Sequence, residues 1–315
     1  MKVYCVQYSA HAGKWIYNGL KSAWASLDYE TVTPSGNKRE TTTTMMWPSN
    51  PETLNEDYYI MCTADMVNGS MPLKAVQNAK KAFLFVQPTQ YPMPWGRHQN
   101  FVNLAPEKCI NELNQLDNVV YWTFADVGSD NYYHLWGKEV HTIPLAFDSF
   151  GYTPAVNEKM KQIDIAFVGG WANNGFDEKR KIIVEIFSKF KDSGLKCGFF
   201  VNKNLTHQQE CDLLANSKIT LNIHDAYQRT LGLDTNERTF KSLGLNGAMV
   251  SDKVEQLNRL FPEVKTSLDS NEIVSFAREL LELSEQELTD IKEKNRLDIL
   301  NNHTYVNRIE ALLKI

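Results

Sequence analysis

The stretch NERTFKSLGLNGAMVSD, residues 236–252, predicts a helix start, a glycine break and a short buried strand in direct succession. Either Thr235 or Asn236 can cap a helix over 237–245, because a short polar side chain accepts a hydrogen bond from the first turn. A glycine then opens the apolar run 247–251. A helix followed at once by a buried strand is the repeating unit of a parallel sheet covered by helices.

The same alternation extends in both directions from this stretch. In the first half we predict strands at 2–9, 57–64, 82–87, 118–125 and 140–146, and helices at 14–27 and 105–116. In the second half we predict strands at 163–169, 196–202, 218–224 and 247–251, and helices at 177–192, 207–216 and 237–245. The tail from 270 to 315 is helical in pattern almost throughout, with Asp269, Ser270 and Ser284 as candidate caps.

This pattern predicts an α/β protein with two Rossmann-like, doubly wound domains that face a central cleft, and a helical C-terminal tail. A chain of 315 residues, 43% of them apolar, is long enough for both. We place the first domain at 1–150, the second at 151–300, and a last helix at 301–315 that packs back on the first. Because ligands of open α/β sheets bind at the carboxyl ends of the strands, functional residues are expected in the loops there.

Composition excludes several other classes. The formal net charge of -5 gives no electrostatic reason to expect nucleic acid or an anionic membrane, although a local basic groove is compatible with it. The five cysteines show no Cys-x-x-Cys spacing, which argues against a structural zinc site and a disulfide framework. The polar start is unlike a signal peptide, and no run of about 18 apolar residues occurs. We therefore expect a cytoplasmic protein with no membrane partner.

An arginine at a helix entrance is unusual, because cations are favoured at the other end of a helix. Arg238 stands in the first turn of the helix predicted over 237–245. Free backbone amides and a guanidinium then point to the same edge of the sheet, which suits a diphosphate. The structural alternative is a surface arginine paired with Glu237 or Asp234.

Two glycines end the predicted strand 163–169. Gly169 and Gly170 would let the backbone approach a phosphate closely. A tight turn that needs positive φ is the structural alternative.

Residues 213–261 carry a family resemblance. This segment contains SKITLNIH at 217–224, the opening stretch, and LNRLF at 257–261. It resembles the donor-binding half of GT-B glycosyltransferases, most closely the CgeB-like group of spore-maturation and related glycosyltransferases. The connector IPLAFD at 143–148 is also similar to the interdomain strand of these enzymes, whereas the first half matches only in architecture.

The resemblance implies a nucleotide sugar as donor. It assigns its pyrophosphate to Arg238 and to the helix amides of Thr239 and Phe240. The remaining residues implied to lie at the donor are Gly169, Gly170, Asn222 and His224.

Lys241 departs from the family pattern, in which many relatives have a glutamate that holds the donor ribose. A lysine cannot accept those hydrogen bonds. Either Glu237 takes the ribose or Lys241 adds a second cation for the phosphates. The departure leaves inversion or retention of stereochemistry open.

We expect no metal and no other cofactor. No Asp-x-Asp motif follows a predicted strand, so nothing in the sequence calls for a divalent ion at the phosphates. Arginine, lysine and a helix terminus can stabilise a departing nucleoside diphosphate. This expectation agrees with the metal-independent habit of the GT-B group.

The first half would hold the catalytic base and the acceptor. His11 lies in the loop after the first strand, where a histidine of inverting relatives deprotonates the acceptor; a merely polar or capping histidine is the alternative. The competing bases, each also after a strand, are Asp65, His98 and Asp126. The residues expected to contact the acceptor, because aromatic faces stack on sugars and bases, are Trp47, Trp95 and Arg97.

The sequence thus predicts a metal-independent Leloir glycosyltransferase that moves a sugar from a nucleotide diphosphate donor, a UDP-sugar, to a hydroxyl on a glycan or small molecule. A phage-type enzyme that modifies a hydroxymethylated base in DNA, in the cytoplasm of a host, is a second hypothesis. A non-catalytic two-domain protein that closes on a small ligand is a third. The sequence does not indicate an oligomeric state.

Overall fold

The structure, a computed structural model, describes residues 1–5, 12–32, 47, 50–86, 106–126, 136–171, 178–203 and 205–315, with the backbone alone at 12–14. The chain divides into two compact units. Unit 1 consists of residues 1–144 and 305–315, and unit 2 of residues 145–304.

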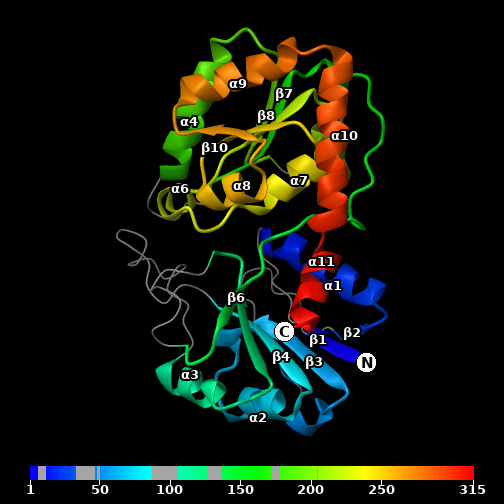
Figure 1. The fold of residues 1–315 in the computed structure, drawn as a ribbon, viewed down its shortest axis with the longest axis vertical. Helices are drawn as coiled ribbons and strands as arrows, with labels where there is room; N and C mark the ends of the chain where they lie inside the picture. The colour runs from blue at the N-terminus through cyan, green and yellow to red at the C-terminus, as the bar shows by residue number, and fades with distance from the viewer. Residues whose placement is uncertain are drawn as a thin grey trace. The chain divides into compact units, whose positions relative to one another are not determined.

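Unit 1 is built on a parallel sheet with the strand order β2-β1-β3-β4-β5-β6 (Figure 1). Its strands are β1 (Lys2–Cys5), β2 (Glu30–Val32), β3 (Tyr58–Thr63), β4 (Lys81–Phe85), β5 (Val119–Thr123) and β6 (Val140–Thr142). Its helices are α1 (Ala12–Ser26), α2 (Ser70–Asn78), α3 (Glu107–Asn114) and α11 (Tyr305–Leu313), with short 3-10 turns η1 (Pro51–Thr53) and η2 (Ala64–Met66).

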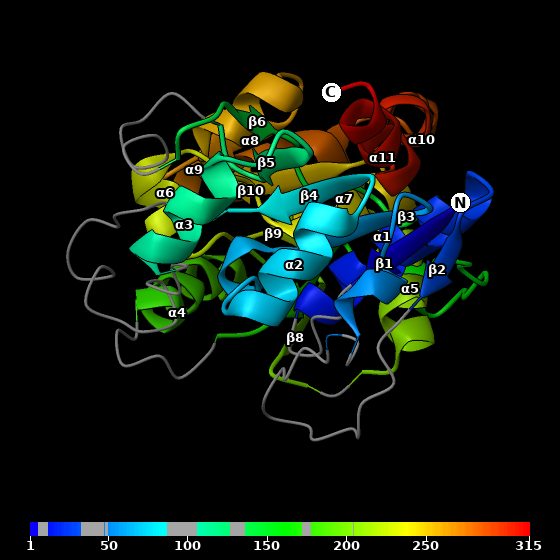
Figure 2. The same cartoon turned by 90° about the horizontal axis from the view of Figure 1, so that it is seen from below.

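Helices cover both faces of this sheet, which explains why its strands are apolar on both sides. Helices α2 and α3 lie on one face (Figure 2). They bury Val76 and Ile110 against Ile60 and Leu84 of the strands. On the other face, Trp24 of α1 is fully buried against Tyr59 and Phe83.

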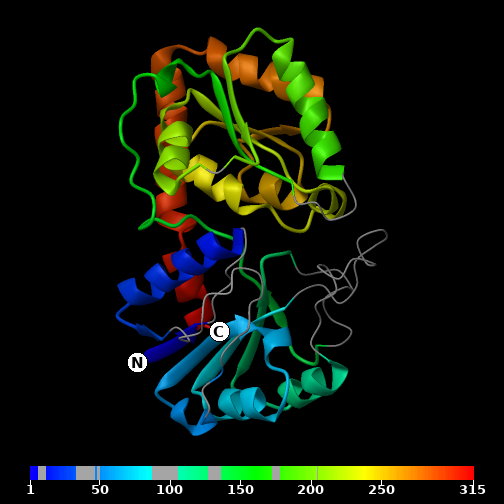
Figure 3. The ribbon, with the colours of Figure 1, turned by 180° about the vertical axis from the view of Figure 1, so that it is seen from behind.

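The last helix of the chain belongs to unit 1. Helix α11 packs along α1, as the red and blue ribbons show in Figure 3. The ring of Tyr305 lies so close to Gly19 that any Cβ at residue 19 would collide with it. A glycine at this position therefore lets the two helices approach closely.

Unit 2 is built on a second parallel sheet with the order β11-β10-β9-β7-β8. Its strands are β7 (Ile165–Gly169), β8 (Cys197–Val201), β9 (Ile219–Asn222), β10 (Met249–Asp252) and β11 (Lys265–Ser267). Its helices are α4 (Glu178–Lys191), α5 (His207–Asn216), α6 (Ala226–Leu231), α7 (Glu237–Leu245), α8 (Glu255–Leu260), α9 (Ser270–Glu282) and α10 (Glu285–Asn302), with a 3-10 turn η5 (Met160–Gln162).

The core of unit 2 lies between its sheet and two helices. Ile183 of α4 and Ile273 of α9 pack with Phe167, Leu221 and Val250 of the strands. Helices α5 and α7 cover the opposite face, and α10 lies against α7 (Figure 1). Two doubly wound parallel sheets and a helical tail confirm the predicted fold class.

Several elements differ from the sequence expectation. Strands β2 and β11 and helices α2, α6 and α8 were not predicted. The two strands have three residues each and α6 and α8 six, too short for a periodic signal. No helix in the described ranges is long and apolar enough to cross a membrane.

Candidate functional site

The strand order of unit 2 indicates where a ligand would bind. Strand β7 lies between β8 and β9, so the chain leaves β7 toward one side of the sheet and leaves β9 toward the other. The carboxyl ends of two strands at such a reversal leave a crevice in which open α/β sheets bind ligands. In this sheet the crevice falls between the ends of β7 and β9.

Arg238 lies at this reversal. Asn236 caps α7, accepting a hydrogen bond from Thr239 N (3.1 Å), as the sequence predicted. In the first turn, the guanidinium donates from Nε to Val168 O of β7 (2.6 Å) and from Nη1 to Ile223 O after β9 (3.0 Å). The side chain is half-buried, and loss of solvent lowers its pKa, although arginine has so high an ordinary value that it stays charged. Arg238 therefore joins the two strand ends that flank the crevice.

Gly169 gives the guanidinium its room. A Cβ at this residue would lie 2.5 Å from Arg238 Nη2. Among the described residues none accepts a hydrogen bond from Nη2, whereas Nε and Nη1 both donate to the protein. The cation also lies over the ring of Phe167, with Cζ 4.9 Å from the centroid.

Gly169 and Gly170 are not required by a turn with positive φ, the structural alternative considered from the sequence. Neither Gly169 nor Gly170 has a positive φ, so the positive-φ alternative is wrong. A Cβ at residue 170 would collide with Asn202 Oδ1, which accepts from Trp171 N (3.1 Å). Close approach of Arg238 and Asn202 explains both glycines.

A second cation, Lys179, lies beside Arg238 and was missed by the sequence analysis. Its Nζ donates to Ile223 O (2.9 Å) and pairs with Asp225 Oδ1 (3.1 Å). Burial lowers its pKa, Asp225 opposes that shift, and the charge of Arg238 adds to it. A lysine in the first turn of α4 is as unfavourable for a helix as Arg238 in α7, but Arg180 and Lys181 share that turn, so this signal marks three cations and does not single out Lys179.

Three donors meet at Ile223 O, since Asn236 Nδ2 also donates to it (3.2 Å). A carbonyl oxygen has only two lone pairs. Lys179 and Arg238, called the cation pair below, thus share one acceptor that Asn236 also uses.

Lys241 has protein partners of its own. Its ammonium is buried between Glu210 of α5, with which it forms a very close ion pair, and Glu237 of α7 (3.4 Å). Burial opposes the charged form, but the two carboxylates outweigh it and raise the pKa of Lys241. Glu237 also accepts a hydrogen bond from Tyr152 Oη (3.1 Å). Lys241, one turn after Arg238 in α7, therefore neutralises two acids of the protein itself.

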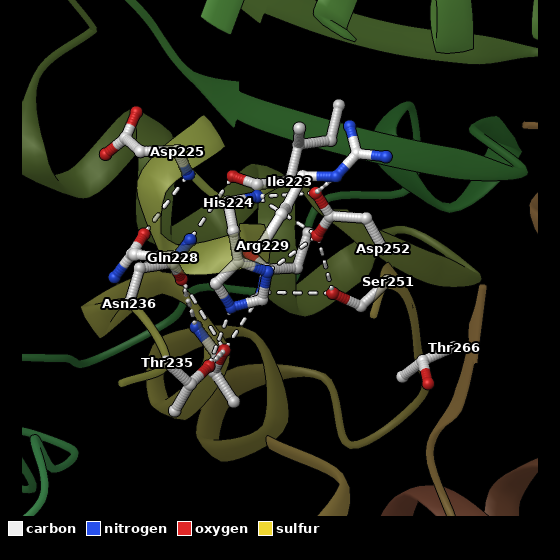
Figure 4. A network of polar contacts seen from close by, with 12 residues as sticks. Ile223, His224, Asp225, Gln228, Arg229, Thr235, Asn236, Ser251, Asp252 and Thr266 are labelled. Carbon is white, nitrogen blue, oxygen red and sulfur yellow. Dashed lines mark hydrogen bonds and ion pairs between the residues drawn. The ribbon is translucent and has the colours of Figure 1, made fainter. Parts of the chain in front are cut away.

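Asn222, His224, Thr239 and Phe240 are all fully buried. Asn222 Nδ2 donates to Thr239 Oγ1 (2.9 Å), and Asn222 Oδ1 accepts from Arg238 Nη1 (3.4 Å). The ring of His224 lies between Asp252 and Thr235 (Figure 4). The ring of Phe240 packs edge-on against Phe261. Direct contact of these residues with a donor stays a prediction.

In unit 1 the structure describes two of the four predicted bases. Asp65 lies in η2 directly after β3, half-buried, and burial raises the pKa of its carboxyl. Asp126 follows β5 and is half-buried. The predicted residues outside the described ranges are His11, Trp95, Arg97 and His98.

Trp47, predicted to face an acceptor, packs on the core of unit 1. Its ring stacks on Tyr4 with centroids 5.9 Å apart, and Nε1 donates to Met66 O (3.1 Å). In the parts of the chain that the structure describes, no three His, Cys, Asp or Glu side chains are grouped to hold a metal ion.

Comparison with solved structures finds similar folds over the full chain. The T4 phage protein BGT in complex with UDP-glucose is 13% identical, with a TM-score of 0.55 over 98% of this chain and 97% of that one. AviGT4, a glycosyltransferase of avilamycin A biosynthesis, is 13% identical, with a TM-score of 0.55 over 100% and 96%. A trehalose-6-phosphate structure from E. coli bound with UDP-2-fluoro glucose is 10% identical, with a TM-score of 0.55 over 100% and 98%. At these identities the likeness shows a shared fold.

Comparison of sequences gives the family. No curated protein matches the chain. The model of the family described as glycosyl transferase-like matches residues 154–314, about half of the chain, including the whole crevice region of unit 2. The chain therefore belongs to the glycosyl transferase-like family.

Proposed function

We propose that the chain transfers a sugar from a uridine diphosphate donor to a hydroxyl of an acceptor. The observation that carries the proposal is the meeting of Arg238 and Lys179 at Ile223 O, where the strand order of unit 2 reverses. Two adjacent cations at a helix N-terminus suit a diphosphate better than a single charge. Two of the similar structures hold UDP-glucose and UDP-2-fluoro glucose, which supports uridine as the nucleoside of the donor.

The cation pair would also assist the chemistry. When the bond between sugar and phosphate breaks, negative charge builds on the departing UDP. Fixed positive groups aimed at that charge lower the barrier, since they need not reorganise during the reaction. We propose that Arg238 and Lys179 supply this stabilisation and that no divalent ion is required.

Metal removal tests this part of the proposal. One T4 phage structure holds UDP with Mn²⁺, so a metal requirement is a real alternative for the fold. Turnover that is unchanged after EDTA treatment and gel filtration would support the cation pair alone. Activity that is lost with EDTA and restored by added Mn²⁺ or Mg²⁺ would contradict it.

For the general base that deprotonates the acceptor hydroxyl, we propose His11 or Asp65 ahead of His98 and Asp126. In the chain, His11 follows β1 and Asp65 follows β3, and these two strands flank the order reversal of the first sheet. The raised pKa of Asp65 suits a general base, which works best when its pKa lies nearer to neutral pH. The true base is the one whose removal lowers kcat by about 10²-fold or more and leaves UDP binding unchanged.

We further propose the CgeB-like group as the subfamily, on the motif of residues 236–252. Lys241 forms ion pairs with both Glu237 and Glu210. A ribose hydroxyl near this cluster would find carboxylate oxygens there, even though the glutamate of relatives is a lysine in this chain.

A second acceptor class follows from one comparison. The DNA-modifying β-glucosyltransferase matches over 100% of this chain and 99% of its own, with a TM-score of 0.51 and 11% identity. Salt-dependent retention of the purified protein on duplex DNA would favour a DNA base as acceptor. No retention at low salt would favour a glycan or small-molecule hydroxyl.

A thermal-shift screen tests the donor. A ligand that binds only the native state must raise the melting temperature. We expect UDP and UDP-sugars to do so more than ADP or GDP, and Arg238→Ala to abolish the shift. Tight binding without turnover across donors and acceptors would favour a non-catalytic binding protein instead.

A further inference from the structure

One peptide group connects the cation pair to a buried carboxylate. Its carbonyl, Ile223 O, accepts from Lys179 and Arg238. Its N–H, on His224, donates to both oxygens of Asp252, at 3.0 Å each (Figure 4). Because a trans peptide is planar, its N–H and C=O point in opposite directions. The 223–224 peptide dipole therefore lies between an anion at its N–H end and two cations at its carbonyl end.

The carboxylate is itself held rigidly. Asp252 ends β10 and is fully buried. Its Oδ1 accepts from the Nδ1 of His224 (2.6 Å) and the hydroxyl of Ser251 (3.3 Å), and Arg229 Nε lies 3.7 Å from Oδ2. Burial would raise the pKa of Asp252, but His224, Arg229 and Lys179 together lower it. The group stays ionised and its acceptor atoms are fixed.

A second route leads from the same histidine to the same guanidinium. Nε2 of His224 lies 2.8 Å from the hydroxyl of Thr235, which lies 2.6 Å from that of Thr239. Asn222 bonds Thr239 through Nδ2 and Arg238 through Oδ1. Figure 4 shows Thr235 and Asp252 on opposite sides of the ring. The ring thus ties β10 to the loop that leads into α7.

We propose that Asp252 is a positioning residue for the donor diphosphate. By holding the N–H of the 223–224 peptide, it fixes the carbonyl that aligns Arg238 and Lys179, and a bond at each end polarises the peptide so that both bonds strengthen. Asp252 is wholly out of contact with solvent, so it acts through these cations and not on the donor itself. The inference rests on the proposed function of the cation pair.

If the buried pair of Asp252 and His224 served only to stabilise the fold, a different result would be expected. General loosening of unit 2 would weaken binding of every part of a nucleotide. Misplaced cations would weaken binding of the diphosphate and spare the nucleoside. The readout is therefore the affinity for UDP compared with that for uridine, each measured by titration of the full chain.

Asp252→Asn is the main variant. Loss of charge-assisted bonds predicts a rise in Kd for UDP of about tenfold or more, with Kd for uridine unchanged. Asn246→Ser is the matched control, because Asn246 is also buried and donates to Leu214 O (2.8 Å) and Ser217 O (2.7 Å). We expect this control to lower the melting temperature and to leave both affinities intact.

Two further measurements keep the inference open to refutation. If Asp252→Asn does not fold, Ser251→Ala removes one bond to the carboxylate and should raise Kd for UDP about threefold. With Lys179→Met as background, Asp252→Asn should cost less UDP affinity than it does alone, because the two residues act through one carbonyl.

The outcomes separate this inference from the proposed function. Wild-type protein that binds no UDP overturns the function and the inference together. Wild-type protein that binds UDP, with a variant of Asp252 that binds it equally well or loses UDP and uridine in equal measure, overturns the inference alone.

Discussion

The two units share a strand pattern and differ in the charges at its centre. In both sheets the second strand lies outside the first, giving β2-β1-β3 in unit 1 and β8-β7-β9 in unit 2. At the reversal in unit 2 stand two cations, Arg238 and Lys179. After β3 in unit 1 stands an acid, Asp65, whose pKa burial raises. In our proposal, the strand ends of unit 2 use positive charge to hold the leaving group, and those of unit 1 use a carboxylate to accept a proton, although the backbone topology is the same.

The largest effect expected from this difference is the loss of Arg238. Arg238→Ala should lower kcat/KM by about 10²- to 10³-fold, the cost of removing one donor from a developing anion. Steady-state kinetics with a UDP-sugar measures it. Arg278→Ala is the control, since this exposed arginine of α9 bonds only Ser193 O among the described residues. Equal activity of Arg238→Ala and Arg278→Ala would show that Arg238 has no part in the reaction.

Asp65→Asn should have the next largest effect if Asp65 is the base. We expect kcat to fall about 10²-fold while Kd for UDP stays constant. In the wild type, activity should fall as pH drops through the raised pKa of Asp65, because the base must be ionised. The exposed Asp57→Asn serves as control.

Asp65→Asn should lower activity but raise thermal stability. Because the pKa of Asp65 is raised on folding, the folded protein binds more protons than the unfolded chain at a pH just above the ordinary pKa of an aspartate. The ionised carboxyl therefore lowers the free energy of unfolding at neutral pH. Asp65→Asn should therefore raise the melting temperature at pH 7. A variant that is both less stable and fully active would show that Asp65 has neither property.

Lys179→Met should have a smaller effect than Arg238→Ala. Lysine contributes one point charge, whereas arginine has a fork of donors. We expect a rise in Kd for UDP of about tenfold, by titration calorimetry. Lys189→Met, at the exposed end of the same helix, should leave Kd unchanged. An effect of Lys179→Met as large as that of Arg238→Ala would contradict the greater weight that we assign to the arginine.

The smallest effect is expected at Lys292, which lies near the amino end of strand β9. Burial lowers the pKa of Lys292 of α10 to about 8, and its Nζ donates to Ser217 O (3.1 Å). Between about 8 and its ordinary value the unfolded chain binds more protons, so stability rises with pH across that window. Lys292→Met should remove the rise in melting temperature from pH 8 to 10. Donor binding should not change.

Sequence alone predicted the elements with a clear period or cap. Helix α7 covers Glu237–Leu245 with Asn236 as its cap, as expected. Asp269 and Ser284 cap α9 and α10, whereas Ser270 is the first residue of α9 and donates to Glu185. These features depend on neighbours in the chain, which is why local rules reach them.

The same local rules predicted only part of the candidate site. Arg238 stood out because a cation at a helix start is locally unfavourable. Its partner Val168 lies in β7 and its partner Ile223 directly after β9, and Glu210 meets Lys241 from another helix. Only the strand order brings them together, and no spacing in the sequence encodes it.

The place of α11 has a consequence for synthesis of the chain. Tyr305 must reach Gly19 before the outer face of α1 is covered, and the two lie at opposite ends of the sequence. Unit 2, which is continuous from 145 to 304, can finish folding while unit 1 still lacks its last helix. On a ribosome, which releases the N-terminus first, the unit made first would therefore be the last to close.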